Sequence, residues 1–142
     1  MQQGHGWPLA GAAFVAFLAA APSDAADAWY LERGTASWYG ERFQGLETAS
    51  GEMFDLNQLT AAHRELPFGA EVRVIHLGTG ASVSVVINDR GPCIDGRDID
   101  LSKAAARELG IINDGLAPVL IEADLEQLAQ AARTQTRRSR GC

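Results

Sequence analysis

The sequence predicts a mainly β chain that closes into a small barrel, with one short helix in the barrel region and a second helix near the C-terminal end. Short stretches of β-branched and aromatic residues recur between turns that contain glycine and proline, and only one short helical pattern interrupts them. At 142 residues, 46% of them apolar, the chain has room for one core of roughly 100 residues. One domain is therefore expected.

The strand pattern is clearest in a predicted hairpin between residues 72 and 88. Apolar and polar residues alternate there, Gly78-Thr79-Gly80 supplies the turn, and Val83, Val85 and Ile87 share one face. Glycine, proline and polar residues separate the other β-prone stretches. The expected strands are residues 34–39, 59–63, 71–76, 83–88 and 117–123.

Two helices are expected after this hairpin. Ser102 can cap a helix that runs through Leu109, and Gly110 is a typical stop residue. An amphipathic helix is expected from Asp124 through Ala132. The predicted division of the chain is a leader at residues 1–28, a barrel domain at 29–123, and a C-terminal helix with a basic tail at 124–142.

The N-terminal segment is typical of an export signal. Its first 23 residues contain no Asp, Glu, Lys or Arg, and the apolar run Leu9–Ala21 is too short, at about 20 Å of helix, for a bilayer core of about 30 Å. Ala26-Asp27-Ala28 resembles a cleavage site, and Ala19-Ala20-Ala21 offers an earlier one. We expect an exported protein, periplasmic or extracellular, without a stable membrane span after leader removal. No cysteine precedes Cys93, so lipid anchoring through the leader is not expected.

Composition also restricts the partners. The formal net charge of -6 and the pI of about 4.9 argue against nucleic acid binding, which needs a basic face. The two cysteines, Cys93 and Cys142, allow one disulfide in an oxidising compartment or two separate thiols, and the sequence leaves both open. Their spacing is not that of metal ligands. No metal and no cofactor are expected, and the protein is expected to be a monomer.

Three side chains are candidates for chemistry by their local context. Asp89 directly follows an apolar strand, where a carboxyl is held rigidly and partly desolvated, which suits a proton donor; its structural alternative is a turn or a salt bridge to Arg90. His63 lies among small residues in a strand, and its alternative is a structural histidine. Glu52 follows Gly51 in a loop, where most glutamates are only solvated.

A set of short motifs, in order over about ninety residues, resembles the rare lipoprotein A family of lytic transglycosylases. No single motif is specific for this family, but the complete set of motifs in this order and spacing is specific for it. The matching segments are Gly34-Thr-Ala-Ser-Trp-Tyr-Gly40, Thr48-Ala-Ser-Gly-Glu52, Thr60-Ala-Ala-His63, Leu66-Pro-Phe-Gly69, Val86-Ile-Asn-Asp-Arg-Gly-Pro92 and Arg97-Asp-Ile-Asp-Leu-Ser102.

The resemblance implies a six-stranded double-psi β-barrel that cleaves peptidoglycan glycan strands. It implies an endolytic-type cut between N-acetylmuramic acid and N-acetylglucosamine without water, leaving a 1,6-anhydro end, with a preference for peptide-poor strands. Asp89 matches the family's catalytic acid, and Glu52 and His63 match its other required cleft residues. Protonated Asp89 would protonate the leaving oxygen and then take the proton of the attacking 6-hydroxyl.

Further residues near these motifs are candidates for substrate binding. Trp38 and Tyr39 can stack on a sugar face or pack in the barrel wall. Arg90 can contact substrate, although pairing around its turn is an alternative, and Asp100 is expected to have a structural role near the helix start.

The sequence also departs from the family and leaves rival functions open. It has no lipobox cysteine, no room after residue 123 for a septal peptidoglycan-binding domain, and Cys93 where relatives often have an aromatic residue. The main rival is a non-catalytic, expansin-like glycan-binding module, which would not need a proton donor beside a second carboxylate. An inverting hydrolase would need carboxyl groups about 6.5 to 9.5 Å apart. A metal site of Glu52, His63 and Asp89 is the weakest alternative.

Overall fold

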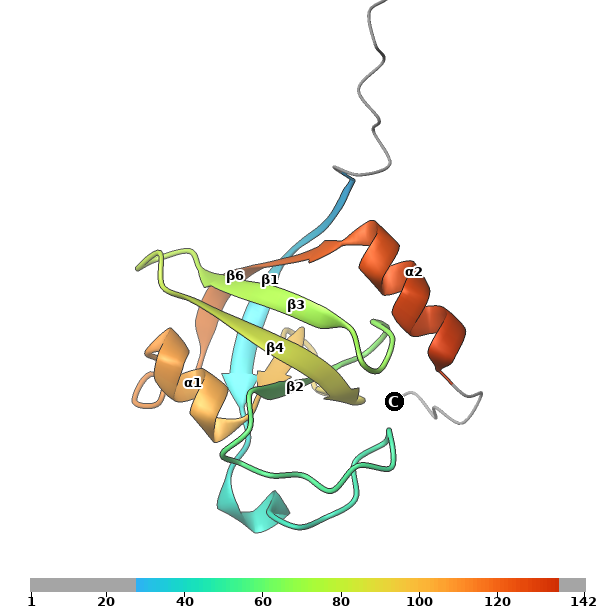
Figure 1. The fold of residues 1–142 in the computed structure, drawn as a ribbon. Coiled ribbons are helices and arrows are strands. Elements are labelled where there is room, and N and C mark those ends of the chain that lie inside the picture. The colour runs from blue at the N-terminus through green and yellow to red at the C-terminus, as the bar shows by residue number, and fades with distance from the viewer. Residues whose placement is uncertain (1–27, 136–142) are drawn as a thin grey trace, which may run out of the picture.

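The computed structural model describes residues 28–135 and shows the mainly β fold that the sequence predicts. Six strands, two α-helices and one short 3₁₀ helix make up this part of the chain (Figure 1). In order they are β1 (Trp29–Trp38), η1 (Glu41–Phe43), β2 (Thr60–His63), β3 (Glu71–His76), β4 (Ser82–Asp89), β5 (Ile99–Leu101), α1 (Lys103–Leu109), β6 (Ala117–Asp124) and α2 (Leu125–Thr134).

The six strands form a closed barrel in the order β1-β5-β2-β4-β3-β6. Two pairs are parallel, β1 with β5 and β2 with β4, and the other four pairs are antiparallel. Strands that are distant in sequence therefore lie side by side. The parallel pairing of β2 with β4 places the C-terminal ends of these strands, which carry His63 and Asp89, side by side.

The barrel encloses the core because its strands alternate inward apolar and outward polar residues. On β3, Val72 and Val74 are buried, whereas Glu71 before them and Arg73 between them are exposed. Each fully buried valine or isoleucine contributes about 1.5–3 kcal/mol to stability. The inward residues of the other strands and one face of α1 complete this core: Val83, Val85, Ile87, Ile99, Leu101, Val119, Ile121, Ala105, Ala106 and Leu109.

Two strands differ from the sequence-based expectation. β1 begins at Trp29, five residues before the expected start at Gly34, because the antiparallel ladder with β6 extends back to the pair Trp29–Asp124. β5 is only three residues long and was not expected as a strand, since such a segment is too short to show a period. Its pairing with β1 on one side and β2 on the other makes it a strand.

The helix ends are those that the capping residues predict. Ser102 is the N-cap of α1, where its Oγ accepts a hydrogen bond from the amide of Ala105 (3.2 Å) and donates one to the carbonyl of Gln58 (2.6 Å). Gly110 ends α1 with a φ of 80°. The carboxylate of Asp124 caps α2 by accepting the amide of Gln127 at 3.0 Å.

Some expectations fall outside the described residues. The expected leader lies outside them except for Ala28, as does most of the basic tail. No helix within residues 28–135 has the length and apolar character needed to cross a membrane. Cys93 is disulfide-bonded, and the expected partner, Cys142, is not among the described residues.

Replacing Ser102 with alanine should destabilise the fold. The side chain is fully buried, so Ser102→Ala removes the cap of α1 and leaves the carbonyl of Gln58 without its donor. We expect a loss of about 1–3 kcal/mol in the free energy of unfolding, measured by urea denaturation. Ser84→Ala, at an exposed position of β4, is the control and should stay within about 0.5 kcal/mol of the parent. Equal stability of the two variants would contradict this role.

Candidate active site

Asp89 is the last residue of β4, and its carboxylate is anchored to the backbone. Its Oδ1 accepts hydrogen bonds from the amides of Ala49 and Arg90, both at 2.9 Å. Within the described residues, Oδ2 has no hydrogen-bonded partner, and the side chain is partly exposed. One carboxyl oxygen is thus fixed, and the other is available to a ligand.

A β-bulge sets the direction of Asp89. The parallel pairing of β2 with β4 matches Ala61 with Ile87 and then Ala62 with Asp89, so Asn88 is an extra residue in β4. Ile87 is fully buried in the barrel core. In a regular strand with the same sequence, Asp89 would share the inward face of Ile87, because residues two apart in a strand point to the same side. The bulge is what brings the carboxyl to the outer surface.

The loop before β2 brings Glu52 to the same end of β4. The amide of Ser50 donates to the carbonyl of Asn88 at 3.2 Å, and the side-chain amide of Asn88 donates to Glu52 Oε2 at 3.4 Å. The loop is closed on itself by Thr48, whose Oγ1 donates to the carbonyl of Glu52 at 2.7 Å. Asp89 and Glu52, predicted as functional residues, are therefore brought together.

Glu52 stands between two hollows in the surface. One has a volume of about 490 Å³ and is lined on its far side by Phe68 and by Gln135 at the end of α2. The other, of about 440 Å³, is lined by residues that include Met53 and Asn88. Glu52 is the residue that these two hollows share, and Asp89 lines neither of them.

Asp100 lies on the same outer face as Asp89. The register of four neighbouring strands places Ser37, Asp100, Ala62 and Asp89 in one row across the sheet. Its Oδ1 accepts a hydrogen bond from Ser37 Oγ at 3.1 Å. The pKa of Asp100 is raised to about 6, chiefly by burial and to a smaller extent by the charge of Asp89, while the hydrogen bond from Ser37 and the charge of Arg97 oppose the rise.

Sequence reasoning assigned Asp100 a structural role at the helix start, but the cap is Ser102. The available signal was a single carboxylate between the apolar residues Ile99 and Leu101, which is the alternation of a strand with one outward residue. Two carboxyls on one face, one of them with a raised pKa, are a typical acid–base arrangement. Asp100 is the candidate that the sequence analysis missed.

Tyr39 and Trp38 lie at the end of β1, close to these carboxyls. The ring of Tyr39 stacks on Phe54 at 4.5 Å and meets Phe43 edge-on at 5.5 Å. Its hydroxyl is buried without a hydrogen-bonded partner among residues 28–135, and burial together with the charges of Asp89 and Asp100 raises its pKa. Trp38 is partly buried against the barrel core. Tyr39 is thus packed into the wall with its hydroxyl near the carboxyl pair.

His63 points to the other side of β2 from the carboxyl row. It follows Ala62, and successive side chains in a strand face opposite ways. Its Nδ1 accepts the amides of Glu65 (3.1 Å) and Leu66 (3.0 Å), so the proton is on Nε2, which donates to Glu32 Oε2 at 2.9 Å. The ring is 3% exposed, and both nitrogens are occupied by the protein.

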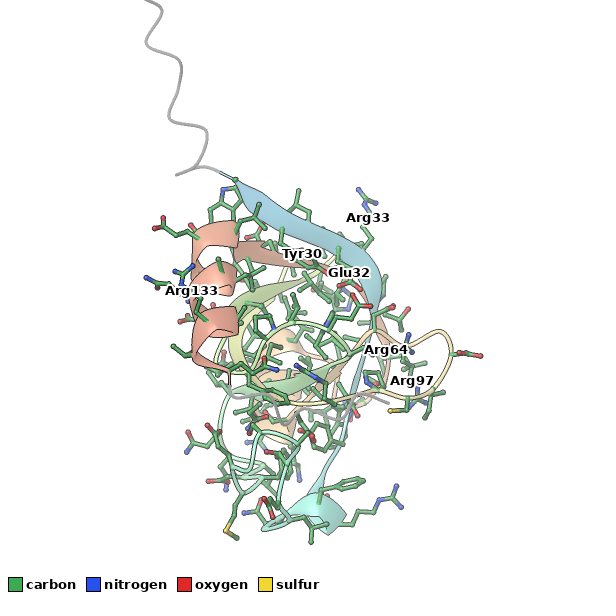
Figure 2. The ribbon with its side chains drawn as sticks, turned by 90° about the vertical axis from the view of Figure 1, so that its right-hand side faces the viewer. Tyr30, Glu32, Arg33, Arg64, Arg97 and Arg133 are labelled. Carbon is green, nitrogen blue, oxygen red and sulfur yellow. The ribbon has the colours of Figure 1, made fainter. Side chains whose placement is uncertain are left out.

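Glu32 also accepts a hydrogen bond from the hydroxyl of Tyr30 at 2.5 Å, and Figure 2 shows both side chains together on β1. Within this network, burial and the nearby Glu32 carboxylate raise the pKa of Tyr30. Tyr30, Glu32 and His63 thus link the first strand to the turn that follows β2.

Two arginines hold the loops around the site. Arg90 donates to the carbonyls of His63 (3.2 Å) and Leu66 (2.8 Å), and its guanidinium lies 3.9 Å from the ring centroid of Phe68. These contacts occupy much of the side chain that was predicted to bind substrate. Arg64 donates to the carbonyls of Pro92, Ile94 and Arg97 at 2.7–2.8 Å and fastens the loop after Asp89 (Figure 2).

The described residues contain no group of three or more His, Cys, Asp or Glu side chains arranged to hold a metal ion.

The closed six-stranded barrel with its outward carboxyls defines a double-psi β-barrel domain of the kind found in lytic transglycosylases. A family model described as lytic transglycolase matches residues 31–121, and the chain belongs to this family. Similar curated proteins carry the name endolytic peptidoglycan transglycosylase RlpA, with "probable" added for some. The Neisseria meningitidis protein is 52% identical over 93 residues, or 66% of this chain and 39% of the relative.

A further relative is similar in sequence, and two solved structures are similar in fold alone. The protein of Synechocystis is 54% identical over 92 residues, or 65% of this chain and 29% of the relative, so the chain spans about a third of the length of such relatives. The solved structures of a Streptomyces papain inhibitor and of apo Clavibacter michiganensis expansin share the fold. Their TM-scores are 0.54 and 0.53 at 23% and 22% identity, with coverage of 66% and 65% of this chain and 93% and 49% of theirs.

Replacing His63 should destabilise the fold and, as a consequence, lower any activity that depends on the fold. His63→Ala removes the acceptor of two buried amides and opens a cavity, and we expect a loss of about 2–4 kcal/mol in the free energy of unfolding by urea denaturation. Glu32→Gln, which keeps an acceptor for Nε2, is the milder control. Unchanged stability together with lost glycan cleavage would instead place His63 in the chemistry.

The pKa of Asp100 should depend on its neighbours. A carboxyl-carbon NMR titration should give a value near 6, which falls in Asp89→Asn and rises in Arg97→Gln. Because the folded pKa is above the unfolded value, the contribution of Asp100 to stability is largest below pH 4 and is lost as the pH rises through about 6. Asp100→Asn should remove that part of the pH dependence. A titration unaffected by Asp89→Asn would show that the carboxyls do not interact.

Proposed function

We propose that this domain cleaves the bond between N-acetylmuramic acid and N-acetylglucosamine in peptide-poor peptidoglycan strands, without water, to leave 1,6-anhydro ends. The observation that carries the proposal is the anchored strand-end carboxyl Asp89, with Glu52 beside it and Asp100 on the same face. The relatives' name, endolytic peptidoglycan transglycosylase, supports peptidoglycan as the substrate, and the bond and the anhydro product rest on the family resemblance of the motifs. A barrel that only bound glycan would not need this carboxyl group cluster.

Asp89 carries both proton transfers in this mechanism. Its Oδ1 is held by two backbone amides, so Oδ2 presents the proton to the glycosidic oxygen as the bond breaks. The resulting carboxylate then takes the proton from the 6-hydroxyl of the muramyl residue as that oxygen attacks the anomeric carbon. Asp89 gives one proton to the glycosidic oxygen in the first step and regains one from the 6-hydroxyl in the second. The enzyme therefore returns to its starting protonation state.

Glu52 stabilises the positive charge that develops on the sugar ring. It is exposed, lines both hollows and is hydrogen-bonded to Asn88, the neighbour of Asp89, so an ionised carboxylate there can stabilise positive charge on a sugar bound near the end of β4. His63 and Arg90 have their polar atoms engaged with the protein and position the loops around the cleft. Asp100, with its pKa near 6, keeps a proton beside Asp89 under mildly acidic conditions. Tyr39 lies next to the carboxyl pair, whereas Trp38 packs against the barrel core.

The proposed setting is outside the cytoplasm, where the substrate lies. We assign residues 1–28 to a signal peptide, 29–123 to the catalytic barrel, and 124–142 to a C-terminal helix with a basic tail. The domain acts as a monomer on the glycan strand in the periplasm or at the cell surface.

Asp89→Asn should abolish cleavage while leaving the fold intact. Peptide-free glycan strands are incubated with the parent and with the variant, and the products are read by mass spectrometry. We expect 1,6-anhydro-muramic ends from the parent and a rate lower by about 10²–10⁴-fold in the variant, the usual contribution of a general acid–base group. Asp114→Asn, at an exposed position in a turn, is the matched control and should cleave like the parent.

Three other outcomes would contradict the proposal. Products with reducing ends would indicate a hydrolase. Intact strands that sediment with the protein would indicate a binding module of the expansin kind. Full activity in Asp89→Asn would remove this residue from the mechanism.

A further inference from the structure

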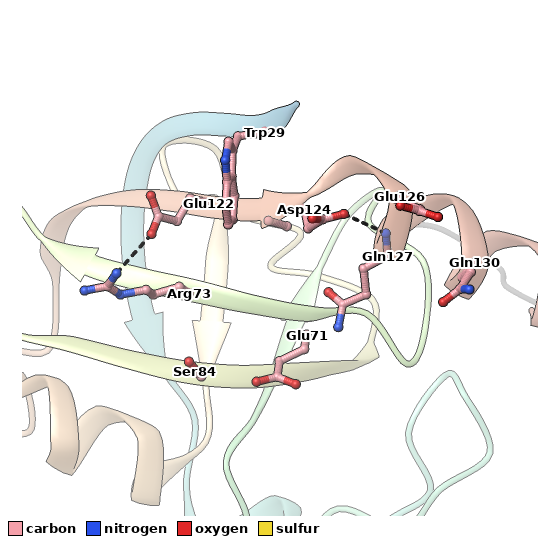
Figure 3. Close-up of a pocket in the computed structure, with 10 residues that line it drawn as sticks. Trp29, Glu71, Arg73, Ser84, Glu122, Asp124, Glu126, Gln127 and Gln130 are labelled. Atoms are coloured by element: carbon pink, nitrogen blue, oxygen red, sulfur yellow. Dashed lines mark hydrogen bonds and ion pairs between the residues drawn. The ribbon is translucent and has the colours of Figure 1, made fainter. Parts of the chain in front are cut away.

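A third hollow lies away from the cleavage site, on the outer face of the barrel next to α2. It has a volume of about 560 Å³ and shares no lining residue with the two hollows around Glu52. Strands β1, β3, β4 and β6 form its floor and α2 forms one wall (Figure 3). The lining residues that matter below are Trp29, Glu71, Arg73, Glu122, Asp124 and Glu126.

The strand register accounts for the polar floor of this hollow. Arg73 pairs with Glu122 on β6 and with Ser84 on β4, and Trp29 pairs with Asp124. These residues alternate with buried core residues, so their side chains point out of the barrel. The hollow is thus built from rigid strands and needs no loop movement to form.

Trp29 leaves a large aromatic side chain in solvent at the edge of this hollow. The residue is 55% exposed, and Figure 3 shows its indole standing beside Glu122 and Asp124. An indole offers a flat apolar surface together with a polar N–H, and such rings are used to bind ligands that are apolar on one face and polar at the edges. A pyranose ring is a ligand of this type, because its C–H groups form one face and its hydroxyls the rim.

The charges of the residues around the hollow favour a ligand with a positive charge. Glu71, Glu122, Asp124 and Glu126 supply four carboxylates against the one guanidinium of Arg73. Glu122 pairs with Arg73 at 3.3 Å, and Asp124 caps α2. In the described part of the chain, Glu71 and Glu126 have no hydrogen-bonded or ion-pair partner. The hollow therefore attracts a cation and repels a carboxylate, such as the lactyl group of a peptide-free muramyl unit.

We propose that this hollow binds a glycan unit with a free amine, a non-acetylated hexosamine, with its ring on Trp29 and its ammonium group between Glu71 and Glu126. An ammonium group close to an indole and to unpaired carboxylates gains from both contacts. The inference rests on the proposed function only in taking the wall glycan as the source of the ligand. It adds a second contact with the polymer, separate from the bond that is cut.

The test compares two soluble probes that share one glycan backbone and differ in whether their amines are free or N-acetylated. β-1,4-linked glucosamine tetrasaccharide and its N-acetylated counterpart are titrated into the full chain by calorimetry at mildly acidic pH, where the amine is protonated and the carboxylates are ionised. We expect the amine-bearing probe to bind at least about tenfold more tightly, an effect of one favourable ionic contact, and to weaken as salt is added.

Variants then locate the binding. Trp29→Ala and Glu126→Gln should each weaken it by about tenfold. Leu31→Ala is the matched control, because Leu31 is 62% exposed on the same face of β1 but does not line the hollow, and it should bind like the parent. Glu52→Gln reports whether the probe occupies the cleavage cleft instead, because only binding in that cleft would be weakened by this change. Thermal unfolding of each variant checks that it is folded.

The outcomes separate this site from the cleavage site. Equal binding of both probes would overturn the selection for an amine, and binding that survives Trp29→Ala or is lost in Glu52→Gln would overturn its location. Trp29→Ala should still cut peptide-free strands, and Asp89→Asn should still bind the glucosamine tetrasaccharide. Failure of the proposed cleavage would leave this binding result standing.

Discussion

Closure of the barrel through β5 is the constraint on which the site depends. This strand has three residues, Ile99, Asp100 and Leu101, yet it completes the hydrogen bonds of β1 on one side and of β2 on the other. Ile99 and Leu101 must point inward to fill the core, so Asp100 must point outward. The demand for a closed sheet without free edges thereby places a carboxyl beside the cleft.

A second local feature completes the carboxyl pair. The bulge at Asn88 turns the end of β4 so that Asp89 faces outward, two strands away from Asp100 and at a Cα separation of roughly 10 Å given normal strand spacing. The charge of Asp89 raises the pKa of Asp100, and the charges of both carboxyls raise the pKa of Tyr39. Neither feature requires a loop to move, which is favourable for a site whose groups must be in place before the bond breaks.

The two polar surfaces of the barrel have different characters. The cleavage face carries a few carboxyls whose charges are anchored by backbone amides or reduced by burial, as at Asp89 and Asp100. The hollow near Trp29 has exposed carboxylates and one ion pair. The first arrangement suits proton transfer, and the second suits binding of a cation. Both surfaces are formed by the outward-facing residues that alternate with the core residues along the strands.

The sequence by itself determined the strands with a clear period, the helix caps at Ser102 and Asp124, and the grouping of Asp89 with Glu52 through their motifs. These signals are local or come from ordered short motifs. Only the tertiary structure decided that residues 99–101 form a strand, that Asp100 faces the site, and that His63 turns toward Glu32. These outcomes depend on pairing between segments about 30 to 60 residues apart, and on a one-residue bulge, for which no local pattern carries a signal.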